Sequence, residues 1–374
     1  MVKVLLLYVN AGYGHRKVAE AAAQELKARN GKRLEVEIFD ALEKTNFLFK
    51  NSYSELYFRM VKHTPWLWAL FFSISNSAYV YPVIAPLRTA WNWLQSFSLR
   101  KYLGEKNYDY IIFTHFFPAE VSATMKRNGK IQSKLVTIVT DVIPHRVWVN
   151  PGTDYFWVMS DESAKALTEY GVSAGQIHIK GIPVSADFTR PIDCAAVRKK
   201  LDLDQNRLTI LFSSGSFGMG PTEEVLDTFS QFGDRIQVIV VCGQNKYLLQ
   251  RLNSRQFPFK IRIFGFVDNM PELMSASDLL VAKPGGATMC ESLVKHLPMI
   301  MTSPIPGQET HNAEWLTAHG AAFQIKDAYE IKDIVKRVVQ NPQVLDSVRS
   351  AIKTIAKPQA AADLADSILS GFKS

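Results

Sequence analysis

The chain has 374 residues, of which 47% are hydrophobic and 21% charged, and its formal net charge is +8. This composition excludes a disordered or fibrous chain, and the length exceeds one typical domain of roughly 100 to 200 residues, so we expect two folded domains. Cys194, Cys242 and Cys290 are far apart, which favours neither a disulfide framework nor a zinc site. Most of the positive excess lies in the N-terminal half, where it fits an anionic membrane, nucleic acid or an ordinary basic surface.

The chain opens with an apolar run over residues 2–9 that lacks a signal-peptide cleavage pattern and is too short to cross a bilayer, so we expect a buried strand. Beyond it, aliphatic runs alternate with amphipathic stretches, which predicts βαβ units and a parallel sheet. In the first half the expected elements are a helix over 18–30 and strands over 34–40, 108–115, 133–141, 155–160 and 176–183. In the second half they are strands over 208–215, 236–243, 260–266, 276–282, 297–303 and 321–326, with a helix from about Thr222.

Between the two sets, polar residues replace the apolar runs and Pro183 and Pro191 interrupt regular structure, which predicts a linker over 182–200. The expected fold class is therefore α/β, with two doubly wound, Rossmann-like domains over 1–181 and 201–357. Open parallel sheets bind ligands at the carboxyl ends of their strands, so we expect these ends to face a shared cleft.

A glycine turn follows the expected strand over 276–282 and leads into a helix. The turn and the helix start consist of Lys283, Pro284, Gly285, Gly286, Ala287 and Thr288. Backbone N–H groups at a helix start, the helix dipole and a nearby lysine together favour a bound diphosphate. Glu291, further into the helix, offers a carboxylate to ribose hydroxyls. A tight strand-to-helix turn with a solvated glutamate is the structural alternative.

Polar side chains crowd the loop and helix start that follow the strand over 297–303. They are Gln308, Glu309, His311 and Asn312. Discrimination between sugars depends on fixed hydrogen-bond donors and acceptors, so this cluster favours a hexose site. Helix capping is the alternative for Asn312.

Two further loops at strand ends carry glycine. Gly215, Ser216 and Gly218 follow one strand of the second half, and Gly243 and Asn245 follow the next. Glycine lets the backbone approach a phosphate closely, so we assign these residues to the same donor site. Ordinary strand-to-helix connections would give a similar composition.

Residues 264–316 as a whole resemble the donor domain of GT-B glycosyltransferases, in the family that includes the peptidoglycan GlcNAc-transferase and the diacylglycerol glycosyltransferases. The resemblance implies the two-domain GT-B fold, with a C-terminal helix over 358–374 that packs back on the first domain. It also implies a UDP-sugar as co-substrate, inversion at the anomeric carbon, and neither a cofactor nor a metal.

The resemblance assigns each group of donor-site residues to one part of the UDP-sugar. It implies that the backbone around Phe266 and Val267 holds uracil and that Glu291 binds ribose. It implies further that the glycine turn holds the diphosphate, and that Gln308 and Glu309 contact the hexose.

A second group of candidate residues lies at strand ends in the first half. Gly14 and His15 follow the first strand in a GxGHR string that resembles the N-terminal loop of the diacylglycerol glycosyltransferases. Asp141, His145 and Trp148 form a TDxxxHxxW string similar to one in the same family. An imidazole suits proton transfer near neutrality, and Asp141 is either the general base or the partner that orients His15. A structural histidine and a capping aspartate are the alternatives.

Residues 64–87 contain no Asp, Glu, Lys or Arg, but prolines and polar residues argue against a continuous transmembrane helix. Trp66, Trp68, Phe71 and Phe72 are of types that favour the headgroup boundary, so we predict insertion into a membrane surface. Basic residues expected to engage anionic lipid are Arg59, Lys62, Arg88, Arg100 and Lys101. A pair of buried core helices is the alternative.

We therefore expect an inverting enzyme that moves glucose or galactose from a UDP-sugar to membrane diacylglycerol, without nucleic acid as a partner. We expect it to bind peripherally at the cytoplasmic face of an anionic membrane. GlcNAc transfer to a polyprenyl-linked peptidoglycan precursor is one alternative. A non-catalytic nucleotide- or nucleic-acid-binding protein is another.

Overall fold

The structure is a computed structural model that describes residues 1–10, 12–29, 34–215, 218 and 220–372, with the backbone alone at Ser54. The chain divides into two compact units. The first comprises Met1–Ala186, Pro306–Gln308 and Lys357–Ser374, and the second comprises Asp187–Ile305 and Glu309–Ala356. The interval predicted as a linker contains two short helices, α8 (Ala186–Thr189) and α9 (Cys194–Lys200).

The described part of the first unit is built on a six-stranded parallel sheet with the order β2-β1-β3-β4-β5-β6. Its strands are β1 (Val2–Tyr8), β2 (Leu34–Asp40), β3 (Tyr110–Phe113), β4 (Lys134–Ile138), β5 (Tyr155–Val158) and β6 (Ile177–Ile179). Residues 4–7 of β1 and all of β3 are buried because helices cover both faces of the sheet.

Helices of the first unit fall into two groups. Those that connect neighbouring strands or close the unit are α1 (Tyr13–Ala28), α6 (Phe116–Arg127), α7 (Asp161–Glu169) and α17 (Ala360–Ser370), with short 3-10 turns η2 (Ala41–Lys44), η3 (Arg146–Trp148) and η4 (Ala174–Gln176). The other group, between β2 and β3, is α2 (Phe47–His63), α3 (Pro65–Asn76), α4 (Tyr81–Gln95) and α5 (Phe97–Glu105).

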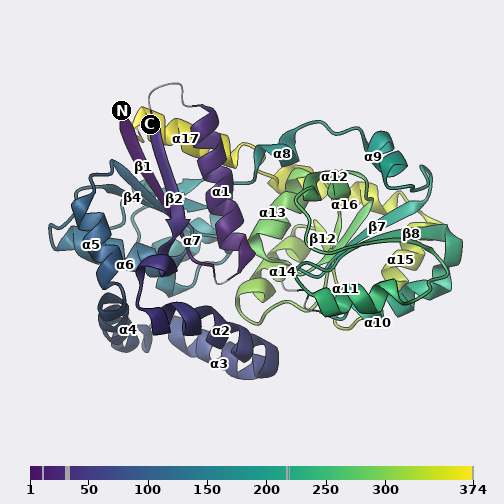
Figure 1. Cartoon of the computed structure of the whole chain (residues 1–374), viewed down its shortest axis with the longest axis horizontal. Coiled ribbons are helices and arrows are strands. Elements are labelled where there is room, and N and C mark those ends of the chain that lie inside the picture. Colours follow the sequence, from purple (N-terminus) through teal and green to yellow (C-terminus); the bar gives the residue numbers. More distant parts are fainter. Residues whose placement is uncertain (11, 30–33, 216–217, 219, 373–374) are drawn as a thin grey trace. The chain divides into compact units, whose positions relative to one another are not determined.

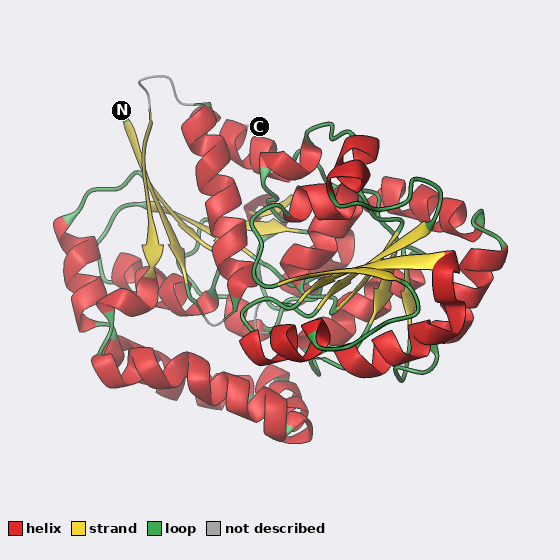
Figure 2. Cartoon of the chain, turned by 45° about the vertical axis from the view of Figure 1, so that its right-hand side comes forward, coloured by secondary structure: helices red, strands yellow, loops and turns green. Residues whose placement is uncertain are grey.

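The second unit repeats the architecture, and its described residues form a six-stranded parallel sheet with the order β12-β11-β10-β7-β8-β9. The strands are β7 (Leu208–Ser213), β8 (Ile236–Val241), β9 (Lys260–Phe264), β10 (Leu279–Ala282), β11 (Met299–Met301) and β12 (Ala322–Gln324). The helices are α10 (Thr222–Phe229), η5 (Ser230–Arg235), α11 (Lys246–Asn253), α12 (Met270–Ser275), α13 (Gly286–Val294), α14 (Gln308–Ala318), α15 (Ile331–Gln340) and α16 (Val344–Ile355). In Figure 2 the strands of each unit are gathered in one twisted sheet between helices. The prediction of two doubly wound α/β domains is confirmed.

Each sheet has one place where the strand order reverses. In the first unit the chain moves outward from β1 to β2 and then returns to β3 on the other side of β1. In the second it moves from β7 outward to β9 and returns to β10 on the other side of β7. A crevice opens at the carboxyl ends of the two strands that flank such a reversal, and ligands of doubly wound folds bind there.

Helices α3 and α4 bear on the prediction of membrane insertion. Among the described residues, no single helix is long and apolar enough to cross a membrane. Together α3 and α4 meet the length and composition of a span, but they bend by 104° at the break between them. The bend agrees with the expectation that the prolines and polar residues of this segment prevent a continuous helix.

The last helix, α17, packs against α1 within the first unit (Figure 1). Its inward side chains include Leu364 and Ile368, which are fully buried, and Lys180 forms an ion pair with Asp363 at 3.7 Å. Beyond the helix, the ring of Phe372 stacks on Tyr155 with 3.9 Å between centroids. The C-terminal segment therefore contributes to the core of the first unit.

We expect Leu364→Ala to lower the free energy of unfolding by about 2–5 kcal/mol, because it leaves a cavity between α17 and α1. Leu369→Ala is the matched control, since Leu369 lies on the same helix but is 42% exposed, and its effect should stay within about 0.5 kcal/mol. Urea denaturation of both variants measures the difference. Equal stabilities would show that α17 does not contribute to the core.

Candidate active site

His15 lies in the first turn of α1, directly after β1. The helix begins at Tyr13 with Gly12 as its N-cap, so Gly14 is already helical and the turn is shorter than the sequence suggested. The His15 Nδ1 atom lies 2.5 Å from the backbone oxygen of Thr114, and the Thr114 hydroxyl donates a hydrogen bond of 2.8 Å to the backbone oxygen of His15. A carbonyl can only accept, so Nδ1 carries the ring proton and Nε2 keeps a free lone pair.

His115 follows β3 and is the neighbour of His15 across the strand reversal. The two rings meet edge to face with 4.8 Å between centroids. The His115 Nδ1 atom accepts a hydrogen bond from the backbone N–H of Phe117 at 3.1 Å, and the residue is buried. The sequence prediction missed His115. The signal that identified His15 and Asp141, a polar residue at the carboxyl end of a buried strand, was present here too.

Both imidazoles are neutral near pH 7. Burial lowers the pKa of His15 to about 4, although the hydrogen bond to the Thr114 carbonyl raises it in part. Burial also lowers the pKa of His115 well below its usual value, and a charge on His15 would lower it further. A neutral imidazole with a free Nε2 is able to accept a proton.

Asp141 follows β4 and is buried. Its carboxylate accepts a hydrogen bond of 3.2 Å from the indole N–H of Trp148, which ends η3. Burial raises the pKa of Asp141 to about 6, and the hydrogen bond from Trp148 opposes this in part. The Trp148 ring lies 6.2 Å from the His15 ring. Among the described residues no hydrogen bond joins Asp141 to His15, and the imidazole is oriented by the Thr114 backbone oxygen, with the Thr140 hydroxyl 3.3 Å from the same Nδ1 atom.

His145 is buried and faces α3. Its Nδ1 accepts a hydrogen bond of 3.0 Å from the backbone N–H of Val147, and its Nε2 lies 3.2 Å from the backbone oxygen of Phe72. The Phe72 ring packs on the imidazole with 4.7 Å between centroids. The prediction that Phe72 lies at a membrane surface is therefore wrong, because this ring is held inside the unit.

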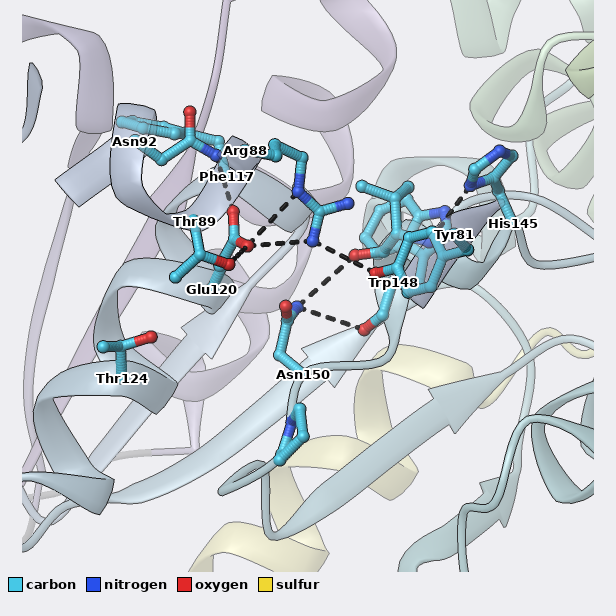
Figure 3. Close-up of polar contacts among 12 residues, drawn as sticks. Tyr81, Arg88, Thr89, Asn92, Phe117, Glu120, Thr124, His145, Trp148 and Asn150 are labelled. Carbon is cyan, nitrogen blue, oxygen red and sulfur yellow. Dashed lines mark hydrogen bonds and ion pairs between the residues drawn. The ribbon is translucent and has the colours of Figure 1, made fainter. Parts of the chain in front are cut away.

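Arg88, expected to engage anionic lipid, is occupied within the protein, so this part of the prediction is also wrong. Its guanidinium bonds to the buried carboxylate of Glu120 at 2.9 and 3.2 Å and to the Tyr81 hydroxyl at 3.1 Å. Figure 3 shows Thr89 and Asn92 completing the shell around the same carboxylate. The network ties α4 to α6, because a buried carboxylate requires charge and hydrogen-bond partners.

The outer faces of α2 to α5 are strongly apolar. Trp66 is 67% exposed and Phe71 57%, whereas Trp68 is half-buried against Tyr57. Other large exposed apolar side chains of these helices are Phe47, Leu48, Leu56, Leu67, Leu70, Ile74, Val83, Leu87, Trp91, Leu94 and Phe97. Of the described residues in α3 and α4, only Phe72, Ser75 and Asn92 are buried. The alternative of two core helices is therefore wrong.

The predicted diphosphate turn lies at the carboxyl end of β10. Lys283 follows the strand, Gly285 is the N-cap of α13, and no described side chain caps the first N–H groups of this helix. The Asn312 side-chain amide donates a hydrogen bond of 2.9 Å to the backbone oxygen of Pro284. A Cβ atom on Gly285 would lie 3.4 Å from a carboxylate oxygen of Glu309. Residues Gly286, Ala287 and Thr288 form the first turn of α13.

The loop after β7 lies on the other side of the strand reversal. Gly218 has φ +61° and a Cβ there would lie 2.5 Å from the backbone oxygen of Cys242, so only glycine fits. The Asn245 side chain donates to the backbone oxygen of Gly218 at 3.0 Å and accepts from the N–H of Leu248 at 2.9 Å. Asn245 therefore fixes this loop against α11. Gly215 and Gly243 also have positive φ, and Ser216 lies outside the described residues.

The other predicted donor residues lie at the same edge of the second sheet or at the start of α14. Phe266 is exposed and Val267 half-buried after β9, and Glu291 is buried in the second turn of α13. Gln308 begins α14, and its contacts group it with the first unit. Among the described residues, no group of three or more His, Cys, Asp or Glu side chains could hold a metal ion.

Comparison with known proteins gives two family matches. Residues 15–184 match the model for monogalactosyldiacylglycerol (MGDG) synthase, and residues 209–367 match the glycosyltransferase family 28 C-terminal domain. Curated relatives include the processive diacylglycerol beta-glucosyltransferases of Bacillus cereus (strain ATCC 10987 / NRS 248) and Bacillus anthracis (strain A0248). Each is 29% identical over 373 residues, which cover 98% of this chain and 93% of the relative.

Solved structures with the same fold include MurG of Acinetobacter baumannii, with a TM-score of 0.64 and 16% identity over 99% of this chain and 100% of that one. Alr3699/HepE of Anabaena in complex with UDP-glucose has a TM-score of 0.57 and 14% identity over 99% of this chain and 100% of that one. At these identities the likeness concerns the fold.

We expect kcat/KM to fall as the pH decreases through about 6, because Asp141 accepts a proton only when ionised and burial raises its pKa to about 6. His15 would remain neutral until about pH 4. A pH–rate profile of the wild type and of His15→Gln tests the assignment, and the variant should be slower but keep the same acid limb. An acid limb near pH 4 in the wild type would identify His15 as the base.

Proposed function

We propose that this chain, which belongs to the diacylglycerol glycosyltransferase family and joins an MGDG synthase domain to a family 28 C-terminal domain, transfers glucose to membrane diacylglycerol. The resemblance inferred from the sequence is confirmed by these matches, and the chain is a UDP-sugar-dependent hexosyltransferase. Glucose is preferred to galactose in the proposal because relatives along nearly the whole chain are named beta-glucosyltransferases. Because members of this family are glycosyltransferases, the alternative of a non-catalytic nucleotide- or nucleic-acid-binding protein is excluded.

One observation carries the choice of a lipid acceptor. Helix α3, whose outer face exposes Trp66 and Phe71, is hydrogen-bonded on its inner face to the loop that contains Asp141 and Trp148. The free glycerol hydroxyl of a diacylglycerol whose acyl chains stay in the membrane would approach the carboxylate along this helix. An enzyme with a water-soluble acceptor would not need so large an exposed apolar surface beside its acceptor site.

The proposed reaction is a single displacement. Asp141 takes the proton of the acceptor hydroxyl, the oxygen attacks the anomeric carbon, and the bond from that carbon to UDP breaks with inversion. Lys283 and the uncapped N–H groups at the start of α13 stabilise the negative charge on the departing diphosphate. Glu291 holds the ribose, and Gln308 and Glu309 hold the hexose. The products are UDP and a β-glucosyl diacylglycerol.

We further propose peripheral binding at the cytoplasmic face of the membrane. The exposed aromatic and aliphatic side chains of α2 to α5 are of the types that bury in the headgroup region, and Trp and Tyr prefer this depth. Lys62 in the last turn of α2 adds positive charge beside the apolar face, which favours anionic lipid, whereas Arg59 is ion-paired with Glu55 on the same helix.

The function is tested by incubating the purified protein with diacylglycerol-containing liposomes and UDP-glucose, UDP-galactose or UDP-GlcNAc. We expect a hexosyl diacylglycerol from UDP-glucose, identified by mass and by its β anomeric signal. Glu291→Ala should raise the KM for the UDP-sugar about tenfold, because ribose loses a charge-assisted hydrogen bond. A product formed only from UDP-GlcNAc on a polyprenyl-linked acceptor would support the peptidoglycan alternative instead.

Membrane binding is tested with the double variant Trp66→Ser, Phe71→Ser in a liposome sedimentation assay. We expect at least tenfold weaker binding to anionic liposomes, because about 25 cal/mol is lost for each Å² of apolar surface that no longer enters the membrane. The matched control is Tyr247→Ser, Tyr329→Ser, which removes two aromatic rings of similar exposure from the second unit. Unchanged binding of the first variant, or weakened binding of both, would argue against the proposed surface.

A further inference from the structure

The loop between β4 and β5 binds the last turn of α3 through two successive residues. His145 accepts the Val147 N–H on Nδ1, so its proton resides on Nε2. The Nε2 atom lies 3.2 Å from the Phe72 backbone oxygen and 3.1 Å from the Ser75 hydroxyl oxygen, and its N–H can donate to either. The Ser75 hydroxyl donates its own proton to the Phe72 oxygen, which leaves its lone pairs free to accept from His145.

Arg146 binds Asn76, the last residue of α3, at two points. Its backbone N–H donates to the Asn76 side-chain oxygen at 2.8 Å, and its Nε donates to the Asn76 backbone oxygen at 3.0 Å. The guanidinium also lies 4.2 Å from the centre of the Tyr170 ring. The last carbonyls of a helix lack hydrogen-bond partners within the helix, and the helix dipole attracts positive charge to this end. The Arg146 guanidinium supplies both the hydrogen-bond donor and the positive charge.

The same loop holds the proposed catalytic carboxylate. Asp141 lies at its start and Trp148 follows Arg146 by two residues, and the indole N–H of Trp148 bonds to the Asp141 carboxylate. A short segment thus connects the inner face of α3 to Asp141. The outer face of α3 carries Trp66 and Phe71.

We infer that His145 and Arg146 are positioning residues, which hold the carboxylate of Asp141 in a fixed position relative to α3. The inference rests on the proposed function, because it takes Asp141 as the base and the membrane as the source of the acceptor. If α3 lies in the membrane surface, these contacts place Asp141 where a lipid hydroxyl emerges. His145 and Arg146 need not touch either substrate.

Two substitutions of His145 separate its two contacts. Asn places its side-chain oxygen near the former Nδ1, so His145→Asn keeps the bond to Val147 but does not reach α3. Gln places its side-chain nitrogen near the former Nε2, so His145→Gln keeps the reach to α3 but loses the bond to Val147. The Asn variant therefore removes the proposed contact, and the Gln variant is the matched conservative control.

We expect His145→Asn to lower kcat on diacylglycerol liposomes by about ten- to a hundredfold, because small misplacements of a catalytic group cost that much. The KM for the UDP-sugar, the fraction bound to liposomes and the Tm should stay near the wild-type values. His145→Gln should recover most of kcat. Asn76→Ala, which removes the acceptor for the Arg146 N–H, should reproduce the loss without any change at His145.

Normal kcat in both His145→Asn and Asn76→Ala would overturn the inference while leaving the proposed function intact. Equal losses of kcat in the Asn and Gln variants, together with a lower Tm, would also overturn it, since they would indicate a purely structural histidine. A wild-type protein that transfers no sugar to diacylglycerol would contradict the proposed function, and the inference with it.

Discussion

His15 and His115 meet because β1 and β3 are adjacent parallel strands whose connections leave in opposite directions. A strand buried on both faces can present functional groups only where it ends, and all strands of a parallel sheet end at the same edge. Asp141, after the neighbouring strand β4, lies at that edge as well. In the second unit the same constraint gathers the glycine turns after β7 and β10. Both candidate half-sites are thus consequences of the strand order.

The two half-sites differ in how they are held. In the first unit, side chains at the strand ends are fixed by neighbouring groups, as the Trp148 indole N–H fixes Asp141 and the Thr114 backbone oxygen fixes His15. In the second, side chains fix the backbone, as Asn312 holds Pro284 and Asn245 holds Gly218. The difference suits the proposed roles, because a base needs an oriented side chain whereas a diphosphate is bound by oriented backbone N–H groups.

The sequence predicted the strands well because each is a short, nearly continuous apolar run between polar segments. It singled out His15 and Asp141 as candidates because the GxGHR and TDxxxHxxW strings that follow two such runs are visible without knowledge of the fold. It missed His115, and it placed Arg88 and Phe72 wrongly at a lipid surface, because the partners Glu120 and His145 lie 32 and 73 residues further along the chain. Composition shows that a helix is amphipathic, but only packing decides which of its residues face inward.

The apolar face of α2 to α5 also governs how the protein behaves away from any membrane. Side chains such as Trp91 and Leu94 have to be covered by something, and in a dilute buffer only detergent or a second copy of the chain is available. Self-association of this kind weakens on cooling, since the hydrophobic driving force is largely entropic near room temperature. Handling the protein cold and with a mild surfactant therefore follows from the exposed face itself.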